Sequence, residues 1–256
     1  MQNAEATKIP ILTYHSIDES GSVISTTPKV FQRQMEFLSK TDYNVVSLKN
    51  FINSLFDGKS LPPKTIVLTF DDGFQNFYTT AFPVLEKYGF EATVFIVTDY
   101  CGKHNNWVGN PSEFPPSKIL SWREIKELSD SGIEFGAHTR THPDLTRISG
   151  VQIESEITES KSAIENALGS EVTTFAYPFG KFNSSAKRVA EKMFKAACST
   201  NLGKVNCSSD FFSLERVDAY YLSNPKIFNS LSSKTFDRYL WFRQSLRDFK
   251  SLISRN

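Results

Sequence analysis

Residues 65–73, with the sequence TIVLTFDDG, decide the fold because they combine a buried strand with two adjacent carboxylates. The first part is a short apolar run rich in β-branched residues, which predicts a strand that Gly73 brings to an end. In α/β folds, ligands and catalytic groups collect at the carboxyl ends of the strands. Asp71 and Asp72 would repel each other there unless a cation or a shared proton relieved the charge. An ordinary surface turn is the alternative, since Asp and Gly are common turn residues.

A second strand-like segment, residues 133–137, runs directly into the sequence HTRTHP at residues 138–143. His138 and His142 are two of only four histidines in the chain, and their spacing would place both on one side of a helical turn. Two imidazoles so placed can bind one metal ion, whereas a single histidine is more often a structural residue. With an Asp from the first motif, the pair forms a His2Asp set with room for water. Such open coordination is typical of a catalytic zinc site.

A third segment, FAYPFG at residues 175–180, completes a pattern that resembles the polysaccharide deacetylases of the NodB-homology type, also called carbohydrate esterase family 4. That family carries an Arg-x-Pro-aromatic motif at this point. The segment ILTYHSI at residues 11–17 is similar to the branch that contains the deacetylases of poly-N-acetylglucosamine, a biofilm exopolysaccharide. The resemblance covers roughly residues 9–221 and implies an α/β fold, a distorted (β/α) barrel of about seven parallel strands.

The resemblance also implies roles for individual residues. The family's metal ligands, which usually hold Zn²⁺ and in some members another divalent ion such as Ni²⁺ or Co²⁺, match Asp72, His138 and His142. Asp71 matches the general base that takes a proton from the attacking water. The backbone N–H of Phe179 matches the donor that stabilises the oxyanion, a contribution typically worth about 3–4 kcal/mol of barrier.

The general acid is expected at an unusual place in the chain. Many family members use a histidine in a late Leu-x-His motif, but this sequence has no histidine after His142. In the branch with the early Tyr-His motif, that early histidine takes the role, which here falls to His15. An imidazole suits the task because its ordinary pKa lies near neutrality. The alternative is a structural histidine at the end of the first strand.

A second departure concerns the residue that orients the base. The family's third motif begins with an Arg, but Ala176 occupies that position here. Arg216, on an expected late strand, could supply the missing guanidinium or could equally form a structural salt bridge. Asp218, two residues later, could steer His15 or Arg216.

The irregular segment 99–118 is expected to shape access for the substrate, as long loops at strand ends often do. Trp107 within it could stack on a sugar ring or could simply anchor the loop as a buried indole. Tyr177, in the third motif, is a further candidate for substrate binding. His104 could in principle join a metal site, although a solvent-exposed histidine is the simpler interpretation.

Composition predicts one globular domain, residues 1–256, acting as a monomer. The net charge of +1 gives no reason to expect nucleic acid as a partner. Cys101, Cys198 and Cys207 are expected to be free thiols, with a Cys198–Cys207 disulfide as the alternative. Residues 1–8 do not resemble a signal peptide, and no apolar run is long enough for a transmembrane span. The sequence therefore favours the cytoplasm, or else an exported protein whose signal has been removed.

Strands and helices are expected to alternate, as in a parallel α/β sheet. The expected strands are Ile11–His15, Asn44–Ser47, Thr65–Phe70, Ala92–Val97, Glu134–His138, Thr173–Tyr177, Ala196–Ser199 and Leu214–Asp218. The expected helices include Phe31–Lys40, Phe77–Tyr88, Ser121–Ser131, Val151–Leu168 and Ser184–Phe194. Residues 230–256 are expected to form an amphipathic helical tail, which would pack on its own domain or rest on an anionic membrane.

Taken together, these features predict a metal-dependent hydrolase that removes N-acetyl groups from N-acetylglucosamine units of an oligo- or polysaccharide. Two alternatives remain open at this point. An O-acetyl esterase could use the same centre on an acetylated glycan, since both reactions pass through a tetrahedral oxyanion. A catalytically weak carbohydrate-binding module could retain the same barrel.

Overall fold

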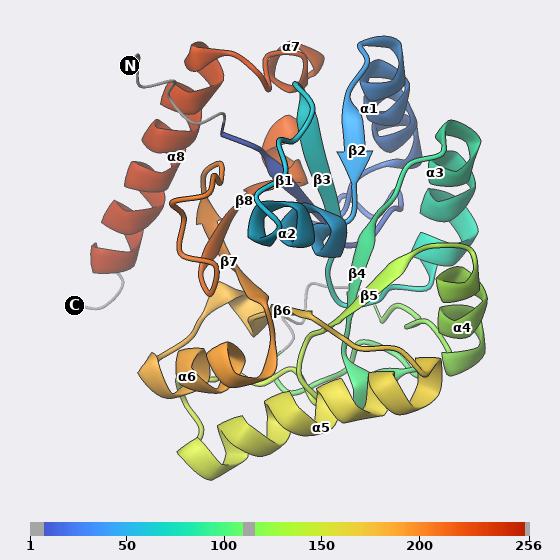
Figure 1. The fold of residues 1–256 in the computed structure, drawn as a ribbon, viewed down its shortest axis with the longest axis vertical. Coiled ribbons are helices and arrows are strands. Elements are labelled where there is room, and N and C mark those ends of the chain that lie inside the picture. Colours follow the sequence, from blue (N-terminus) through green and yellow to red (C-terminus); the bar gives the residue numbers. More distant parts are fainter. Residues whose placement is uncertain (1–7, 110–115, 254–256) are drawn as a thin grey trace.

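A closed ring of parallel strands forms the centre of the computed structural model, which describes residues 8–109 and 116–253 (Figure 1). The sheet has the strand order β1-β8-β7-β6-β5-β4-β3-β2, and an additional β1–β3 pairing closes seven strands into a barrel with β2 attached to β3. The strands are β1 (Ile11–Tyr14), β2 (Asn44–Val46), β3 (Thr65–Phe70), β4 (Thr93–Ile96), β5 (Glu134–Ala137), β6 (Thr174–Ala176), β7 (Ala196–Leu202) and β8 (Leu214–Asp218). The expected (β/α) barrel of about seven parallel strands is confirmed.

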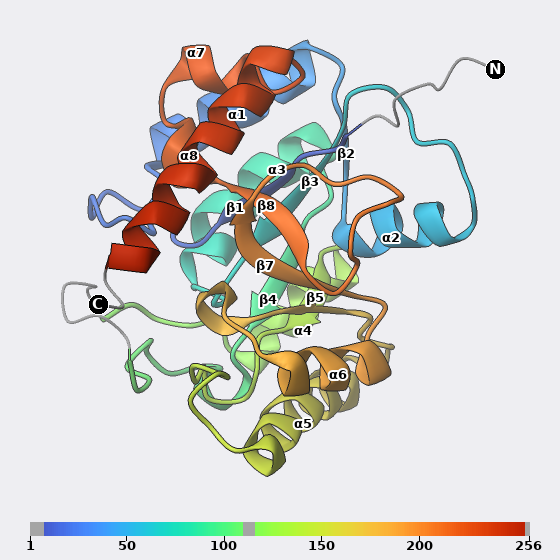
Figure 2. The same ribbon diagram turned by 90° about the vertical axis from the view of Figure 1, so that its left-hand side faces the viewer.

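Helices surround this ring and connect its strands (Figures 1 and 2). The α-helices are α1 (Pro28–Lys40), α2 (Leu48–Phe56), α3 (Phe82–Tyr88), α4 (Trp122–Asp130), α5 (Gly150–Leu168), α6 (Ser184–Met193), α7 (Pro225–Phe228) and α8 (Lys234–Ile253). The short helices are η1 (Phe77–Ala81), η2 (Thr98–Tyr100), η3 (Pro178–Gly180) and η4 (Ala219–Leu222). Capping boxes start α4 and α5, because Ser121 pairs with Glu124 and Ser149 with Gln152.

Buried apolar side chains hold the barrel together. Every residue of β3 is buried, as expected for a strand with helices on one side and the barrel interior on the other. Val67 of β3 belongs to an apolar cluster with side chains from five other strands of the ring, and Leu48, Phe51 and Ile52 of α2 join the same cluster. Helix α2 therefore covers one mouth of the barrel, and it was not among the helices expected from the sequence.

Other elements differ from the expectation in detail. The expected helix Phe77–Tyr88 is divided into the π-helix η1 and the α-helix α3, whose second position is a proline. β7 extends to Leu202, three residues beyond the expected strand. The expected tail contains a single long helix, α8, whose side chains beyond residue 250 lie outside the described set.

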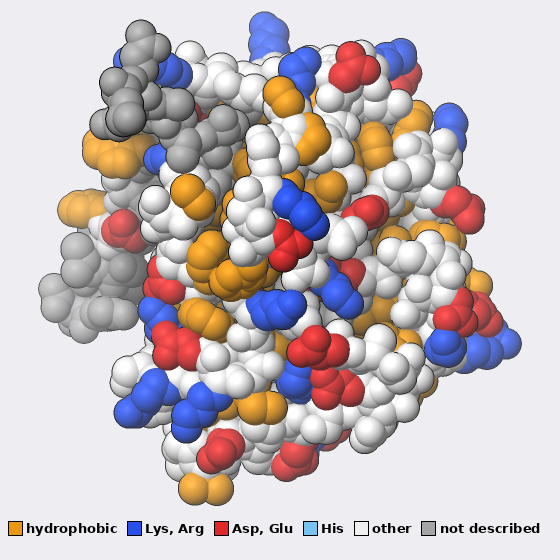
Figure 3. All heavy atoms as spheres, in the orientation of Figure 1, with side chains coloured by type: hydrophobic (Ala, Val, Ile, Leu, Met, Phe, Trp, Pro, Cys, Tyr) orange, Lys and Arg blue, Asp and Glu red, His pale blue; other side chains and the backbone are white. Residues whose placement is uncertain are grey.

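Charge is distributed without a dominant sign on the face shown in Figure 3, where basic and acidic side chains lie among apolar and neutral ones. In the described part of the chain, a bilayer-spanning helix is not found. Even α8, which at 20 residues is the longest helix described, carries charged side chains along its length. The N-terminal residues on which the signal-peptide prediction rests, apart from Lys8, lie outside the described residues.

Candidate metal centre and active site

The two carboxylates of the first motif leave β3 in different directions. Asp72 has a positive φ of 72° and Gly73 follows with 70°, so the chain turns sharply after Asp71. A Cβ added at Gly73 would come 2.9 Å from Ile96 Cγ2 of β4, so the turn lies directly against the neighbouring strand. Both carboxylates are buried, and each has its own set of partners. The sharp turn is therefore what allows adjacent residues to serve two different sites.

Asp72 lies between two imidazoles. Its Oδ1 is 3.4 Å from His138 Nε2 and 3.4 Å from His142 Nε2. The three side chains are buried, and each offers a ligand atom within 4.8 Å of the others. His138 Nδ1 is 2.7 Å from the Ala176 carbonyl oxygen, which can only accept a hydrogen bond. His138 therefore carries its hydrogen on Nδ1 and presents the Nε2 lone pair to the shared space, as a metal-ligating histidine does.

The charge balance of this group suits a cation. Burial would raise the pKa of Asp72, but its close contacts with His138 and His142 outweigh burial and hold that pKa well below its ordinary value. Burial lowers the pKa of His142, which keeps this imidazole neutral and able to act as a ligand. Burial alone would also lower the pKa of His138, but Asp72 and Asp71 outweigh burial and raise it. A metal ion at this position would compete with a proton for the lone pair on His138 Nε2.

The two histidines reach each other without the helical turn expected from their spacing. Thr139 and His142 both have positive φ, 65° and 60°, so residues 138–142 form a looped rather than a helical segment. Thr139 Oγ1 accepts the His142 N–H at 3.0 Å, and Glu156 of α5 accepts the Thr141 N–H at 2.8 Å. The residues predicted as metal ligands therefore lie together, although the helical turn expected between the histidines is absent. Glu156 was not identified from the sequence, since no motif signals it.

Aromatic rings enclose His142. The Trp107 ring lies 4.7 Å from it and the Phe179 ring 4.6 Å, between centroids. His142 Nδ1 is buried and has no hydrogen-bond partner among the described residues. Trp107 itself is only 4% exposed, which agrees with the alternative of a buried indole that anchors the loop. Its ring packs against His142 and Tyr100.

The guanidinium of Arg216, on β8, holds Asp71 in place. Arg216 of β8 donates two hydrogen bonds to the Asp71 carboxylate, at 2.8 and 2.7 Å, and a third to Ser199 O at 2.9 Å. Arg216 is 1% exposed. Burial would raise the pKa of Asp71, but the charge and hydrogen bonds of Arg216 outweigh it and keep that pKa below its ordinary value. The structure therefore places Arg216 where it can orient Asp71.

His15 follows β1 and lies on the same side of the barrel as Asp71. The closing β1–β3 pair brings them together, because the Asp71 N–H donates to Tyr14 O at 2.9 Å. His15 Nε2 is 3.9 Å from Asp71 Oδ2, and the His15 side chain remains 19% exposed. Asp218 uses its carboxylate to cap the Tyr220 N–H at 3.0 Å. Among the described residues no hydrogen bond joins Asp218 to His15 or Arg216, but, against the effect of burial, the charge of Asp218 adds to that of Asp71 in holding the pKa of Arg216 above its ordinary value.

The third motif presents its backbone at the same end of the barrel. Phe179 and Gly180 have positive φ, 57° and 67°. A Cβ at Gly180 would come 2.5 Å from Thr200 N of β7, so only glycine allows this close approach. Tyr177 is fully buried and donates its hydroxyl hydrogen to Phe212 O at 3.0 Å. The Tyr177 ring, a predicted substrate contact, therefore lies in the core of this structure.

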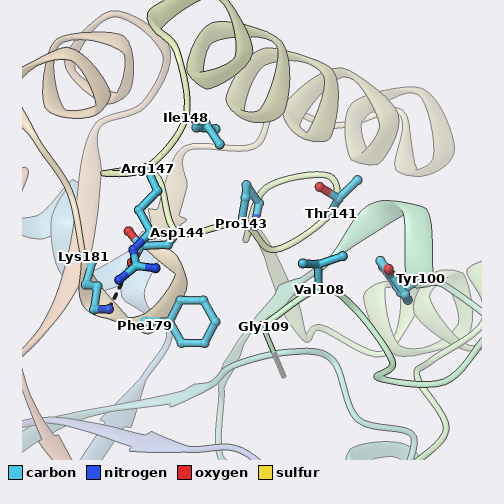
Figure 4. A pocket seen from close by; sticks show the side chains of 10 residues that line it. All are labelled: Tyr100, Val108, Gly109, Thr141, Pro143, Asp144, Arg147, Ile148, Phe179 and Lys181. Atoms are coloured by element: carbon cyan, nitrogen blue, oxygen red, sulfur yellow. Dashed lines mark hydrogen bonds and ion pairs between the residues drawn. The ribbon is translucent and has the colours of Figure 1, made fainter. Parts of the chain in front are cut away.

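A cavity of about 580 Å³ adjoins this centre (Figure 4). Thr141 and Pro143, on either side of His142 in the chain, line it together with Phe179. Tyr100, Val108 and Gly109 of its lining belong to the segment 99–118, which was expected from the sequence to shape substrate access. His104 is exposed and lies outside the metal-ligand group, as expected, and the three cysteines are free thiols rather than partners in a disulfide.

Comparisons with known proteins agree with the geometry. A family model described as polysaccharide deacetylase matches residues 58–195. YxkH of Bacillus subtilis, assigned to the polysaccharide deacetylases, is 31% identical over 212 residues, which cover 82% of this chain and 71% of that protein. A poly-beta-1,6-N-acetyl-D-glucosamine N-deacetylase of Staphylococcus aureus is 28% identical over 177 residues, or 66% of this chain. The match spans only 58% of the staphylococcal enzyme.

Solved structures give the same result. The deacetylase PplD of Streptococcus pyogenes, in complex with acetate, superposes with a TM-score of 0.74 at 27% identity. The match covers 83% of this chain and 92% of that one. IcaB from Ammonifex degensii shares the fold, with a TM-score of 0.71 at 21% identity over 90% of this chain and 97% of that one.

Proposed function

Because this chain belongs to the polysaccharide deacetylase family, we propose that it is a metal-dependent hydrolase that removes N-acetyl groups from N-acetylglucosamine units of an oligo- or polysaccharide. The observation that carries this proposal is the buried Asp72, His138 and His142 group directly beside the Asp71–Arg216 pair. One deacetylase domain, residues 1–256, would contain all of these groups. Poly-N-acetylglucosamine is the proposed polymer, since the staphylococcal relatives are named for it.

Asp72, His138 and His142 would hold the metal. Two imidazoles and a carboxylate suit Zn²⁺, and also Ni²⁺ or Co²⁺. When bound, such an ion supplies Lewis-acid chemistry, which polarises the acetyl carbonyl and acidifies water. The Ala176 carbonyl fixes the orientation of His138, and the rings of Trp107 and Phe179 exclude solvent from His142.

The remaining groups would move protons and stabilise charge. Asp71 is kept ionised and oriented by Arg216, so it can accept a proton from the attacking water. Phe179 would donate its backbone N–H to the oxyanion. His15, partly exposed and 3.9 Å from Asp71, would donate a proton to the leaving nitrogen. These steps convert the acetamide and water into acetate and a free amine.

Acetate release from N-acetylglucosamine oligomers by the zinc-loaded protein tests this function. Asp71→Asn and His15→Ala should both abolish release while zinc content stays at the wild-type level. His104→Ala is the matched control, because it removes an exposed histidine outside the site and should leave the rate unchanged. Release from O-acetylated xylan alone would indicate the esterase, and bound zinc without release from either substrate would indicate the binding module.

A peripheral membrane contact would bring such an enzyme to a lipid-linked saccharide. The outer face of α8 exposes Trp241, Phe242 and Phe249, with Trp241 71% exposed. The helix carries five basic side chains against two acidic ones, a net charge of +3, whereas the whole chain carries +1. We propose that a monomer rests this face on an anionic bilayer, since exposed aromatic residues beside Arg and Lys suit that interface.

A further inference from the structure

The cavity of about 580 Å³ lies next to the proposed reaction centre without containing it. Thr141, Pro143 and Phe179 line it, and the Phe179 ring packs on the His142 ring. The metal-ligand side chains are not part of its lining. A glycan whose acetamido group reached His142 would therefore place a neighbouring sugar, rather than the reacting one, in this cavity.

The walls offer apolar surface to such a sugar. Val108 and Tyr100 lie on one side of the Phe179 ring in Figure 4, and Pro143 lies close by. The volume lies within the range of about 300–1,000 Å³ in which proteins bind small molecules. Sugar rings present apolar C–H faces and polar edges. A cavity with mostly apolar walls and a few polar groups suits one sugar residue with its acetamido methyl group.

The polar groups of the cavity are basic in balance. Among the described residues of the lining, Asp144 is the acidic one, and its side chain is only 15% exposed. Its Oδ1 accepts from the Thr146 N–H at 3.0 Å and the Thr146 hydroxyl at 2.6 Å. Its Oδ2 is 3.0 Å from Lys181 Nζ and 3.6 Å from Arg147 Nε. The carboxylate is thus fully engaged.

Lys181 and Arg147 keep donors to spare. A lysine ammonium has three N–H groups and a guanidinium has five, and only part of each is used on Asp144. Two cations against one carboxylate leave the described lining of the cavity with one excess positive charge. Figure 4 shows these three side chains together on the side of Phe179 opposite Val108 and Tyr100. A ligand here meets hydrogen-bond donors and positive charge. The carboxylate of Asp144 is already engaged by Thr146, Lys181 and Arg147.

We propose that this cavity binds the sugar next to the one being deacetylated, and that it selects the N-acetylated form of that neighbour over the free amine. The proposal rests on the deacetylase function proposed above. A neutral acetamido group can accept hydrogen bonds from Lys181 or Arg147, whereas an ammonium would face two cations. Products would then contain isolated free amines rather than consecutive ones. The preference is expected to be about 3- to 10-fold, because exposed charges are screened by solvent and salt.

Trisaccharides of N-acetylglucosamine test the preference at about pH 6, where a sugar amine is protonated. One substrate is fully acetylated, and two others carry a single free amine at either end. Wild-type protein loaded with zinc should release acetate from the central unit about 3- to 10-fold more slowly when the end unit that occupies the cavity carries the free amine. A free amine at the other end should not slow the release in this way. High salt should reduce that ratio.

Arg147→Glu is the decisive variant, because Arg147 is 81% exposed and its replacement changes the cavity from one excess positive to one excess negative charge. We expect the preference to disappear or reverse. Arg188→Glu on α6 makes the same charge change at an exposed position outside the cavity and should leave the ratio as in wild type. An unchanged ratio in Arg147→Glu would overturn the proposal.

Binding measured by calorimetry tests the cavity proposal independently of the proposed deacetylase activity. Zinc-loaded Asp71→Asn should bind the acetylated trisaccharide more tightly than the corresponding free-amine form, by a similar factor. That preference without acetate release from the wild type would support the cavity and refute the deacetylase. Acetate release at equal rates and equal binding for all three trisaccharides would refute the cavity and leave the deacetylase standing.

Discussion

Replacement of Arg216 by methionine removes the cation that pairs with Asp71 inside the barrel. The pair is almost fully buried, and two short hydrogen bonds of 2.8 and 2.7 Å join the two side chains. Loss of one partner leaves a buried carboxylate without compensation, which typically costs about 3–5 kcal/mol. For a chain of this size, each kcal/mol changes the melting temperature by about 2–4 °C. We therefore expect a decrease of roughly 6–20 °C.

Urea unfolding of the metal-free protein, followed by circular dichroism at constant pH, measures the loss of unfolding free energy. Thermal unfolding of the same samples measures the decrease in melting temperature. Arg188→Met is the control, since Arg188 is exposed and should change stability by less than about 0.5 kcal/mol. Asp71→Asn alone should also destabilise, because it leaves Arg216 unpaired. The double variant Asp71→Asn with Arg216→Met should lose about 2–3 kcal/mol less than the sum of the two single variants.

Two outcomes would refute this reasoning. A loss of less than about 1 kcal/mol in Arg216→Met would mean that the ion pair adds nothing beyond its desolvation cost. Strict additivity in the double variant would mean that the two side chains do not depend on each other. Zinc content should stay unchanged in Arg216→Met, because Arg216 hydrogen-bonds none of the three metal-ligand residues.

Three further predictions concern other parts of the molecule. Zinc at about 100 times its dissociation constant should stabilise the protein by about 2.7 kcal/mol in calorimetry, and a stabilisation that persists in His142→Ala would contradict the proposed ligands. Gly180→Ala should cost at least about 1 kcal/mol more than Gly21→Ala, since both have positive φ but only Gly180 lacks space for a Cβ; equal losses would argue against the close approach. Trp241→Ser with Phe249→Ser should reduce co-sedimentation with phosphatidylglycerol vesicles, and binding that is unaffected, or equal on phosphatidylcholine, would count against the membrane contact.

Most of the strands, and the residues of the candidate metal site, could be predicted from the sequence. The apolar run before Asp71 could only be a buried strand, and β3 is buried along its whole length. His138 and His142, with one Asp of the first motif, were predicted from residue type, spacing and position after strands, because parallel strands deliver their carboxyl ends to one side of a sheet; the choice of Asp72 came from the family resemblance. Because that argument depends on topology, it does not require the helical turn that was expected between the histidines and that the structure lacks.

Contacts between residues far apart in the chain could not be predicted from the sequence, because they depend on how the barrel closes. Arg216 and Asp71 are 145 residues apart, and their contact depends on the β1–β3 and β1–β8 pairings that close the barrel. A sequence shows an Arg on a strand but not the direction of its side chain relative to a closed ring. The same limit explains Trp107 and Tyr177, since an aromatic side chain suits a core and a sugar-binding surface equally well. Burial is a property of the surrounding chain, and it assigned both rings to the interior.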